Sequence, residues 1–395
     1  MSAASPTATH PSRLFDDVAF DAFLREAADG AVERERDRRL LHDEIAHLHD
    51  LSFGALRVPA SRGGVDMPLD AVFDRLIRLA AADASLAHVW RGHLAFVEDL
   101  RMQGADASED WWRRVGRGDL IGNAQSERQT TARLESRIER DGDKVLLSGR
   151  KFYTTGSIYA DWIHLAALDG DERVALTVSA RHPGVRSVDD WDGFGQTLTG
   201  SGTTTFDRVP VDPADIVAAT DDERRGPALA SVFQLSLLAV IAGIAQRALE
   251  DTVAYVLPRR RTYGFAGESV PADDPLVQIV VGEVGAVASA ARRLVLSTAA
   301  ELGAALDGHE AVARLREIQF EVYRLQEIVP RLVLDAATRL FEVGGASAVG
   351  AGPALDRHWR NVRTIASHNP VAQRTRALGQ WALHGTLPPW QAPGA

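Results

Sequence analysis

Basic and imidazole side chains crowd one segment near the C-terminus, between Leu355 and Pro370. Its members are Arg357, His358, Arg360, Arg363 and His368. No carboxylate occurs between Asp356 and the end of the chain. An imidazole titrates near physiological pH and can pass a proton, so a segment of this kind is typical of a ligand pocket. The missing carboxylate argues against a carboxylate general base from this part of the chain.

Several kinds of chemistry are excluded by residue type or spacing. The 395-residue chain has no cysteine, which removes thiol catalysis, thiolate metal sites and disulfides. The histidines His42, His47 and His49 are followed by no HExxH or comparable ligand set, so no metal site is predicted. Neither a Walker A loop nor a GxGxxG turn opens a helix. The formal charge of −10 disfavours nucleic-acid binding as the main role.

Neither a membrane span nor a secretion signal is predicted. The longest apolar run, near Val232 to Ala245, is interrupted by Gln234 and is too short to cross a bilayer. The N-terminus has no apolar signal region, and residues 1–13 are expected to form a disordered lead. We therefore expect a cytoplasmic protein without a membrane partner.

Three parts of different patterning must position these side chains. Apolar residues recur at helical spacing from about 15 to 117, and again from about 227 to 385. The block between them has β character. An α+β fold follows, with predicted boundaries at 14–120 (N-terminal helical domain), 121–225 (β-barrel-like domain) and 226–395 (C-terminal helical bundle).

Local signals refine this division. Asp83 is a possible helix cap within the first part. Two hairpins are predicted in the β block, turning at Asp141-Gly142 and Asp169-Gly170, so the block should be mostly antiparallel. Pro330 should kink its helix or divide it in two.

The segment Gly122 to Thr131, GNAQSERQTT, lies where the first helical part hands over to the β block. Asn123 and Ser126 are its candidate ligand contacts. It resembles the loop that holds the flavin ring in acyl-CoA dehydrogenases. Taken alone, a polar loop capping a strand is the more common structure for such a segment.

The segment Gly149 to Ser157, GRKFYTTGS, resembles the G-x-K-x-W-I-T-N-G strand of the same superfamily, with Tyr153 in place of the Trp. The resemblance places Thr155 beside the flavin and adds Thr154 to the candidate contacts. A hydroxyl beside N5 can bond the N–H of a reduced flavin without adding charge. A Thr-rich edge strand that ends in a glycine turn would look much the same.

Two further segments are more specific. Asp189 to Gly202, DDWDGFGQTLTGSG, resembles the D-D-W-x-x-x-G-Q-R-x-T-x-S-G signature of reduced-flavin monooxygenases on the acyl-CoA dehydrogenase fold, and it contains Ser201. The segment LDRHWRNVRTIASHNP is similar to that family's L-D-R-H-W-R-N-A-R-T-H-T-x-H-D/N-P. Dibenzothiophene monooxygenases and the sulfur-acquisition oxidoreductases are members of the family. Thr197 stands where the family favours Arg, which removes one basic contact.

The resemblance covers about 15 to 390 and implies a four-helix bundle after the β domain. It also implies cofactor-binding roles for Arg260, Gly344, Gly345 and Asn369. Arg260 opens RRTYG, which resembles a motif that reaches the cofactor phosphate of a neighbouring subunit. Arginine suits that task because its planar fork binds phosphate oxygens in pairs. A solvated basic cluster is the alternative for Arg260.

The resemblance identifies the position at which a carboxylate is missing. Asn369 aligns with the Glu that abstracts a proton in acyl-CoA dehydrogenases, and an amide cannot act as that base. We expect His93 and His368 to flank the reacting side of the flavin, with Thr155 and Asn123 holding its ring. A lone histidine on a helix such as His93 is more often a buried, satisfied residue.

The resemblance implies reduced FMN from a separate NAD(P)H-dependent reductase, O2, and a C4a-hydroperoxyflavin that oxygenates a small heteroatom substrate, foremost an organosulfur compound. FAD stays open as the flavin, and a homotetramer built as a dimer of dimers is expected. Ile365 stands where the family has another histidine, so the pocket should be less polar there. Three alternatives stay open: an acyl-CoA dehydrogenase with a relocated base, an N-hydroxylating monooxygenase, and a non-catalytic flavin- or acyl-carrier-binding protein.

Overall fold

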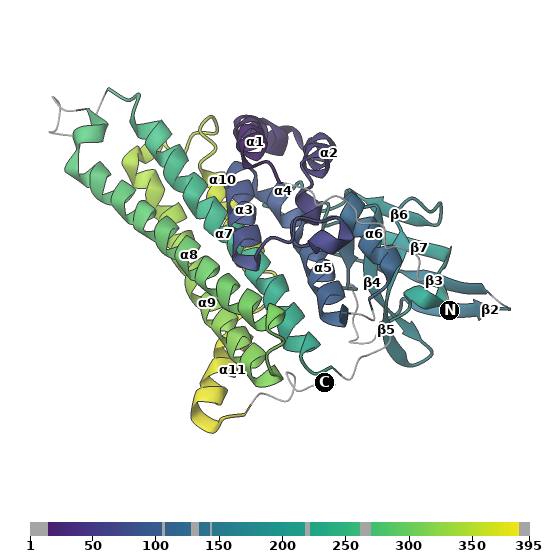
Figure 1. The fold of residues 1–395 in the computed structure, drawn as a ribbon. Helices are drawn as coiled ribbons and strands as arrows, with labels where there is room; N and C mark the ends of the chain where they lie inside the picture. Colours follow the sequence, from purple (N-terminus) through teal and green to yellow (C-terminus); the bar gives the residue numbers. More distant parts are fainter. Residues whose placement is uncertain are drawn as a thin grey trace.

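The computed structural model describes residues 15–104, 107–127, 134–142, 144–217, 222–260 and 270–386. The predicted disordered lead lies outside these residues. Along the chain, helices come before and after the strands of one sheet, which confirms the predicted α+β fold. Figure 1 shows the C-terminal helices at one end of the molecule, the sheet at the other, and α3, α4 and α5 between them. The domain boundaries stay a prediction.

The N-terminal part is a set of short helices. These are α1 (Asp17–Asp37), α2 (His42–Asp50), α3 (Leu69–Ala82), α4 (Ala84–Val89), α5 (Arg91–Gln103) and α6 (Glu109–Arg117). Asp16 caps α1 by accepting from the backbone N–H groups of Val18 and Ala19. Asp83 caps α4 in the same way, so the predicted internal cap is confirmed. The short α4 directs its residues from the bundle toward the sheet.

The β block is one seven-stranded sheet in the order β1-β4-β2-β3-β7-β6, with β5 paired to β4. Its strands are β1 (Ile121–Ala124), β2 (Arg137–Asp141), β3 (Lys144–Lys151), β4 (Trp162–Asp169), β5 (Glu172–Ser179), β6 (Val185–Val188) and β7 (Thr203–Pro210). The hairpins β2–β3 and β4–β5 form where predicted, with Gly142 (φ 59°) and Gly170 (φ 65°) in the left-handed conformation that glycine tolerates. The antiparallel pattern is broken where β1 and β2 each pair with β4 in parallel.

The C-terminal part consists of three long helices that run up and down, with two shorter helices packed on α9. The helices are α7 (Arg225–Val256), α8 (Pro275–Asp307), α9 (Val312–Arg339), α10 (Asp356–Ala366) and α11 (Val371–His384). α9 continues through Pro330 as a single helix, so Pro330 does not divide it, and the alternative of a kink at Pro330 stays a prediction. Burial of Pro330 among the bundle helices holds the segment helical although proline lacks a backbone donor.

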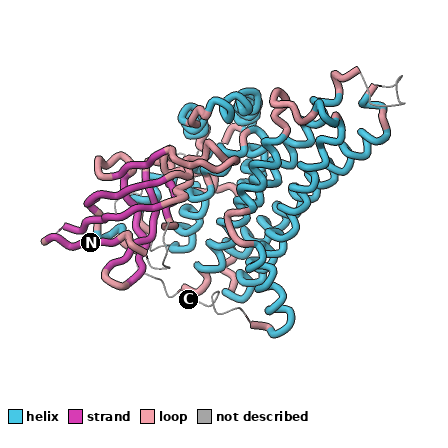
Figure 2. Tube along the Cα trace, turned by 180° about the vertical axis from the view of Figure 1, so that it is seen from behind, coloured by secondary structure: helices cyan, strands magenta, loops and turns pink. Residues whose placement is uncertain are grey.

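Helix α7 is the central helix of the fold, and α3 packs along it. The apolar run around Gln234 belongs to this 32-residue helix, which by length and composition alone could cross a bilayer. In its most apolar window, however, 78% of the residues are buried inside the protein, as in the core helix of a globular fold. Gly243 permits the close approach of α3, because a Cβ there would lie 2.4 Å from the carbonyl oxygen of Ile77. Figure 2 shows the same layers from behind.

Candidate active site

Four segments distant in sequence meet between the sheet and the bundle. The backbone N–H of Asn123, at the end of β1, donates to the carbonyl of Thr155 at 3.4 Å. The N–H of Gly156 donates to the carbonyl of Thr199 at 2.9 Å. The start of α5 reaches the same place, because a Cβ on Gly92 would lie only 2.6 Å from the Cβ of Asn123. The predicted ring contacts Asn123 and Thr155 are therefore neighbours.

Hydroxyl groups form a chain that leads away from Thr155. The Thr155 hydroxyl lies 2.8 Å from that of Ser201, which lies 2.7 Å from that of Thr199. Thr199 in turn donates to the carbonyl of Gln196 at 2.8 Å. Gln196 has a positive φ of 53°, a conformation that costs energy for a non-glycine residue and is common in functional sites. Two predicted contacts, Thr155 and Ser201, are thus joined directly.

The orientation of each amide in this network follows from groups that cannot change their role. The backbone N–H of Gln196 donates to Asn361 Oδ1 at 2.6 Å, so that atom is the amide oxygen. Asn361 Nδ2 then donates to the carboxylate of Glu35 at 3.2 Å. Gln196 Nε2 donates to Asn361 Oδ1 at 3.0 Å, which leaves Gln196 Oε1 as an acceptor 2.9 Å from His88 Nδ1.

His88 must therefore carry its proton on Nδ1, and Nε2 keeps a free lone pair. His88 Nε2 is buried and has no hydrogen-bond partner among the residues that the structure describes. Burial and then the positive charge of Arg91 lower the pKa of His88 to about 4, against a rise from the bond to Gln196. The imidazole is neutral at pH 7 and keeps one buried acceptor without a partner in the described chain.

His368 lies in the turn between α10 and α11 and is exposed to solvent on one side. Its Nε2 lies 3.1 Å from Arg91 Nη1, and because guanidinium can only donate, His368 Nε2 is the acceptor. Close packing and then the charge of Arg91 lower the pKa of His368 well below its ordinary value.

His93 does not reach the site. Its side chain is completely buried, Nε2 lies 2.7 Å from the carbonyl of Gly54, and Nδ1 accepts from the N–H of Ile121 at 3.3 Å. Burial lowers the pKa of His93 to about 4. Since both ring nitrogens are occupied by backbone groups, the geometry argues against the predicted catalytic role. His93 instead joins the Phe53–Ala55 turn to β1.

Two predicted cofactor contacts serve the sheet. Thr154 is buried and bonds the carbonyl of Gly202 at 3.0 Å and the Thr204 hydroxyl at 2.8 Å, on the opposite side from Thr155. Ser126 is exposed and contributes its carbonyl to a bridge with Phe152. Neither side chain faces the hydroxyl chain described above, so the geometry does not favour a direct flavin contact for either.

Asn369 turns toward the helical bundle. Its Nδ2 donates to Gln234 Oε1 at 2.6 Å, and Gln326 Nε2 donates to the same oxygen at 3.0 Å. A small cavity of about 20 Å³ lies beside it, lined in part by His368 and Ile365. The amide at the dehydrogenase base position is held by other amides, and no carboxylate touches it in the described chain.

Three other predicted contacts lie at the far end of the bundle. Arg260 is exposed just beyond α7, and residues 261–264 of its motif lie outside the described residues. A Cβ on Gly344 would lie 2.5 Å from the hydroxyl of Tyr255 on α7. Gly345 has φ 51° and opens a short 3-10 turn. The single chain does not bring these three residues to Thr155.

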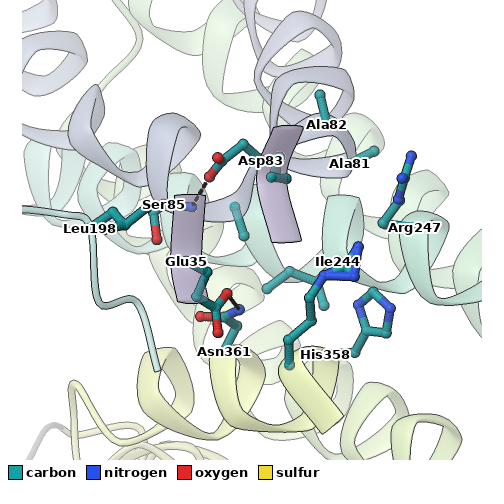
Figure 3. Close-up of a pocket in the computed structure, with 14 residues that line it drawn as sticks. Glu35, Ala81, Ala82, Asp83, Ser85, Leu198, Ile244, Arg247, His358 and Asn361 are labelled. Carbon is teal, nitrogen blue, oxygen red and sulfur yellow. Dashed lines mark hydrogen bonds between the residues drawn. The ribbon is translucent and has the colours of Figure 1, made fainter. Parts of the chain in front are cut away.

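Figure 3 shows a small cavity beyond Asn361, between α1, α3, α7 and α10. Its volume is about 30 Å³, room for one water. Arg357 and His358, which line the cavity, both contact Asp251 of α7: Asp251 accepts from Arg357 Nη2 at 2.7 Å and lies 2.8 Å from His358 Nε2. These contacts lower the pKa of Asp251 despite its burial. Two of the basic residues in the C-terminal segment therefore bind a carboxylate of α7 and fix α10.

The donors and acceptors around Thr155 fit the flavin that the resemblance implies. Asn123 Oδ1 and His88 Nε2 are both buried without a partner in the described chain, which is costly unless a ligand supplies one. A flavin ring carries N–H and carbonyl groups along one edge, and these match an amide and a hydroxyl chain. Among the described residues, no group of three or more His, Asp or Glu side chains could hold a metal ion.

Sequence reasoning missed four residues of this network: His88, Arg91, Gln196 and Asn361. His88 and Arg91 are close in sequence, at the end of α4 and the start of α5, and a histidine beside an arginine within a largely apolar segment was a usable signal. Gln196 stood inside the quoted DDWDGFGQ segment without a role. Asn361 could not be singled out, because its partner lies 165 residues away in the chain.

Comparisons with known proteins agree with this architecture. Residues 235–373 match the family model described as acyl-CoA dehydrogenase, C-terminal domain. The chain is 28% identical over 373 residues to a probable FMNH2-dependent monooxygenase, SfnC, of Pseudomonas putida, covering 91% of this chain and 93% of that protein. It is 27% identical to the dibenzothiophene monooxygenase of Rhodococcus erythropolis, covering 91% and 90%. The FMN-bound structure of TdsC from Paenibacillus sp. A11-2 superposes with a TM-score of 0.87 at 26% identity, covering 94% and 98%. The predicted acyl-CoA dehydrogenase-like fold is confirmed.

Proposed function

We propose that this chain, which has the acyl-CoA dehydrogenase fold and is related along nine tenths of its length to reduced-flavin monooxygenases, is itself a two-component FMNH2-dependent monooxygenase. It would use O2 to oxygenate a small heteroatom substrate, foremost an organosulfur compound. The observation that carries the proposal is the pairing of two unsatisfied buried acceptors, Asn123 Oδ1 and His88 Nε2, beside the hydroxyl chain of Thr155.

Reduced FMN, when bound, supplies the two electrons and the activation of O2. Asn123 would accept from a ring N–H, and the neighbouring Thr155 hydroxyl, backed by Ser201, would bond another polar group of the ring. Tyr153 is half exposed, and its ring lies 6.1 Å from that of Trp191, so an aromatic surface borders the same place. FAD fits these residues as well as FMN does. The FMN-bound TdsC structure and the name of SfnC support FMN.

His88 would hold a hydrogen bond at the reacting centre. Its Nδ1–H is committed to Gln196, so only Nε2 can accept a hydrogen bond or a proton. A pKa of about 4 makes His88 a weak base that accepts a hydrogen bond and does not keep a proton at pH 7. His368 would orient Arg91 at the open side of the site. Thus His88, not His93, is the catalytic candidate beside His368 and Thr155.

The same residues disfavour α,β-dehydrogenation. That reaction needs a base strong enough to remove a carbon-bound proton, and Asn369 is bound to Gln234 at the position where such a base is expected. Glu35 is the carboxylate that the described network reaches. It accepts from Arg360 Nη1 at 2.6 Å and from Asn361. Its negative charge is therefore balanced by Arg360, and Asn361 separates it from the site.

The predicted partners form part of the proposal. A separate NAD(P)H flavin reductase would deliver reduced FMN in the cytoplasm. A homotetramer, built as a dimer of dimers, would cover apolar side chains that this chain leaves exposed on its long helices, which are Leu257, Leu276, Ile279, Ile328 and Leu332. The same assembly would bring Arg260, Gly344 and Gly345 to the cofactor phosphate of a neighbouring subunit.

The direct test mixes the purified chain with FMN, NADH, O2 and a flavin reductase, and supplies a panel of sulfides, sulfones, amines and acyl-CoA thioesters. We expect oxygenated sulfur products that require all four components. An enoyl-CoA product would favour the dehydrogenase alternative, and an oxygenated amine would favour N-hydroxylation. Flavin binding without any product would favour a non-catalytic binding protein.

A further inference from the structure

Four arginine side chains of the described chain are buried, and one of them differs from the rest. Arg34 bonds Asp83 at 3.0 Å, Arg57 bonds Glu98 at 2.6 Å, and Arg357 bonds Asp251 at 2.7 Å. Arg91 is 8% exposed and contacts no carboxylate among the residues that the structure describes. A buried cation without a counter-charge is strongly unfavourable, which is why such charges are almost always paired.

The guanidinium of Arg91 is nevertheless held in one place. Its Nε donates to the carbonyl of Phe233 at 3.0 Å, and its Cζ lies 4.9 Å from the centre of the Phe233 ring. Its Nη1 donates to His368 at 3.1 Å. These contacts use two of the five N–H groups and leave three, including both on Nη2, without a partner in the described chain. An oriented donor set is therefore available beside the open side of His368.

The charge of Arg91 is felt throughout the candidate site. It lowers the pKa of both His88 and His368, second only to the effect of their burial. Burial lowers the pKa of Arg91 itself to about 10, so the group stays a cation at pH 7. No carboxylate raises that pKa, in contrast to Arg57, whose pKa is raised by Glu98 and Asp307. The positive field at this position is uncompensated.

We infer that Arg91 binds the negatively charged end of the substrate, and that the substrate is a small organosulfur anion such as a sulfinate or a thioether carboxylate. This inference rests on the proposed function and deepens it. A sulfinate or carboxylate presents two oxygens, which match the unused N–H groups on Nη1 and Nη2. The substrate then supplies the counter-charge that the chain lacks, next to the free acceptor on His88.

The chemistry balances for either substrate. One atom of O2 forms a new bond to sulfur as the O–O bond breaks. The other atom leaves as water, with the two electrons and two protons that reduced FMN supplies. A sulfinate becomes a sulfonate and a thioether becomes a sulfoxide, and the anionic group on Arg91 is present before and after the reaction.

The test compares substrates matched in size that differ in charge. Methanesulfinate is compared with dimethyl sulfoxide, and (methylthio)acetate, the thioether carboxylate, is compared with its amide, (methylthio)acetamide. The native enzyme should favour the anion of each pair in kcat/KM. Arg91→Met, similar in volume but uncharged, should lower kcat/KM for the anions about 10- to 100-fold. The loss should be at least about tenfold smaller for the neutral partners than for the anions, and Arg91→Lys should recover part of the loss for the anions. A native preference for the neutral member of each pair would overturn the inference.

Reduced flavin is a second possible source of negative charge, and two measurements separate it from the substrate. FMN affinity, followed by flavin fluorescence, should be the same for Arg91→Met and the native protein. A loss of FMN affinity, or an equal loss of turnover for anionic and neutral substrates, would overturn the inference. Calorimetric binding of methanesulfinate to the flavin-free chain needs no turnover. Binding that depends on Arg91, without any oxygenated product, would support the anion site while sinking the monooxygenase proposal, and no binding would count against the anion site.

Discussion

His93 should make folding stability depend on pH without taking part in catalysis. Its pKa is about 4 in the folded chain and about 6.5 when exposed, so below pH 6.5 the unfolded chain binds a proton that the folded chain excludes. The associated stability is present above pH 6.5 and is lost as the pH falls toward 4. Between pH 7 and pH 5 the loss from this one residue amounts to about 2 kcal/mol.

Replacement of His93 by Gln removes this dependence and also breaks contacts to Gly54 and Ile121. At pH 7 the variant should lose roughly 1–3 kcal/mol in the free energy of unfolding, the cost of disturbing a buried hydrogen-bonded group. Its further loss between pH 7 and pH 5 should be smaller than that of the native chain by about 2 kcal/mol. Urea unfolding followed by tryptophan fluorescence at both pH values gives these quantities.

A matched control is His384→Gln, on the exposed surface of α11, which should change the unfolding free energy by less than about 0.5 kcal/mol. The reasoning is refuted if His93→Gln keeps the native pH dependence. It is also refuted if the variant stays stable at pH 7 but loses the coupling of flavin oxidation to product, because that result would restore the catalytic role first expected for His93.

Three further predictions concern the site and its support. His88→Ala should lower the oxygenation rate roughly 100-fold and divert reduced flavin to hydrogen peroxide, measured as the ratio of product to NADH consumed. Native turnover should show no histidine-dependent change between pH 6 and 8, because the pKa of His88 is about 4 and its neutral form is the active one. Thr155→Val should weaken FMN binding about fivefold in a fluorescence titration, since it removes one neutral hydrogen bond, and unchanged binding would exclude Thr155 from the flavin contacts. Lys151→Met should cost roughly 1–3 kcal/mol in the free energy of unfolding, because it removes the 2.6 Å partner of the partly buried Glu127 carboxylate, which keeps the backbone N–H groups of Glu135 and Ser136, and addition of Glu127→Gln should recover part of that loss.

The fold was predictable because its signals are local. Glycine turns marked both hairpins, Asp83 marked the start of α4, and helical spacing marked the long C-terminal helices. Pro330 does not divide its helix, because the packing of the surrounding bundle outweighs the loss of one backbone hydrogen bond. The parallel pairing of β1 with β4 carried no local signal, since it depends on the strand register of the whole sheet.

The site was only partly predictable because its geometry is long-range. Thr155, Ser201 and Asn123 were found from their segments, and the structure places them together. His88 and His93 lie five residues apart on consecutive helices, and composition cannot say which one turns inward to the backbone. The structure distinguishes them, because His93 meets two backbone groups while His88 keeps a free nitrogen.

The central proposal is oxygen transfer from O2 to sulfur by a protein with the acyl-CoA dehydrogenase fold. Turnover of methylthioacetate with FMN, NADH and a flavin reductase under oxygen-18-labelled O2 tests it most directly, with mass spectrometry of the product. We expect one labelled oxygen in each product sulfoxide and none when the label is supplied as water. Product without label from O2, or consumption of O2 with hydrogen peroxide as the sole product from every sulfur compound supplied, would contradict it.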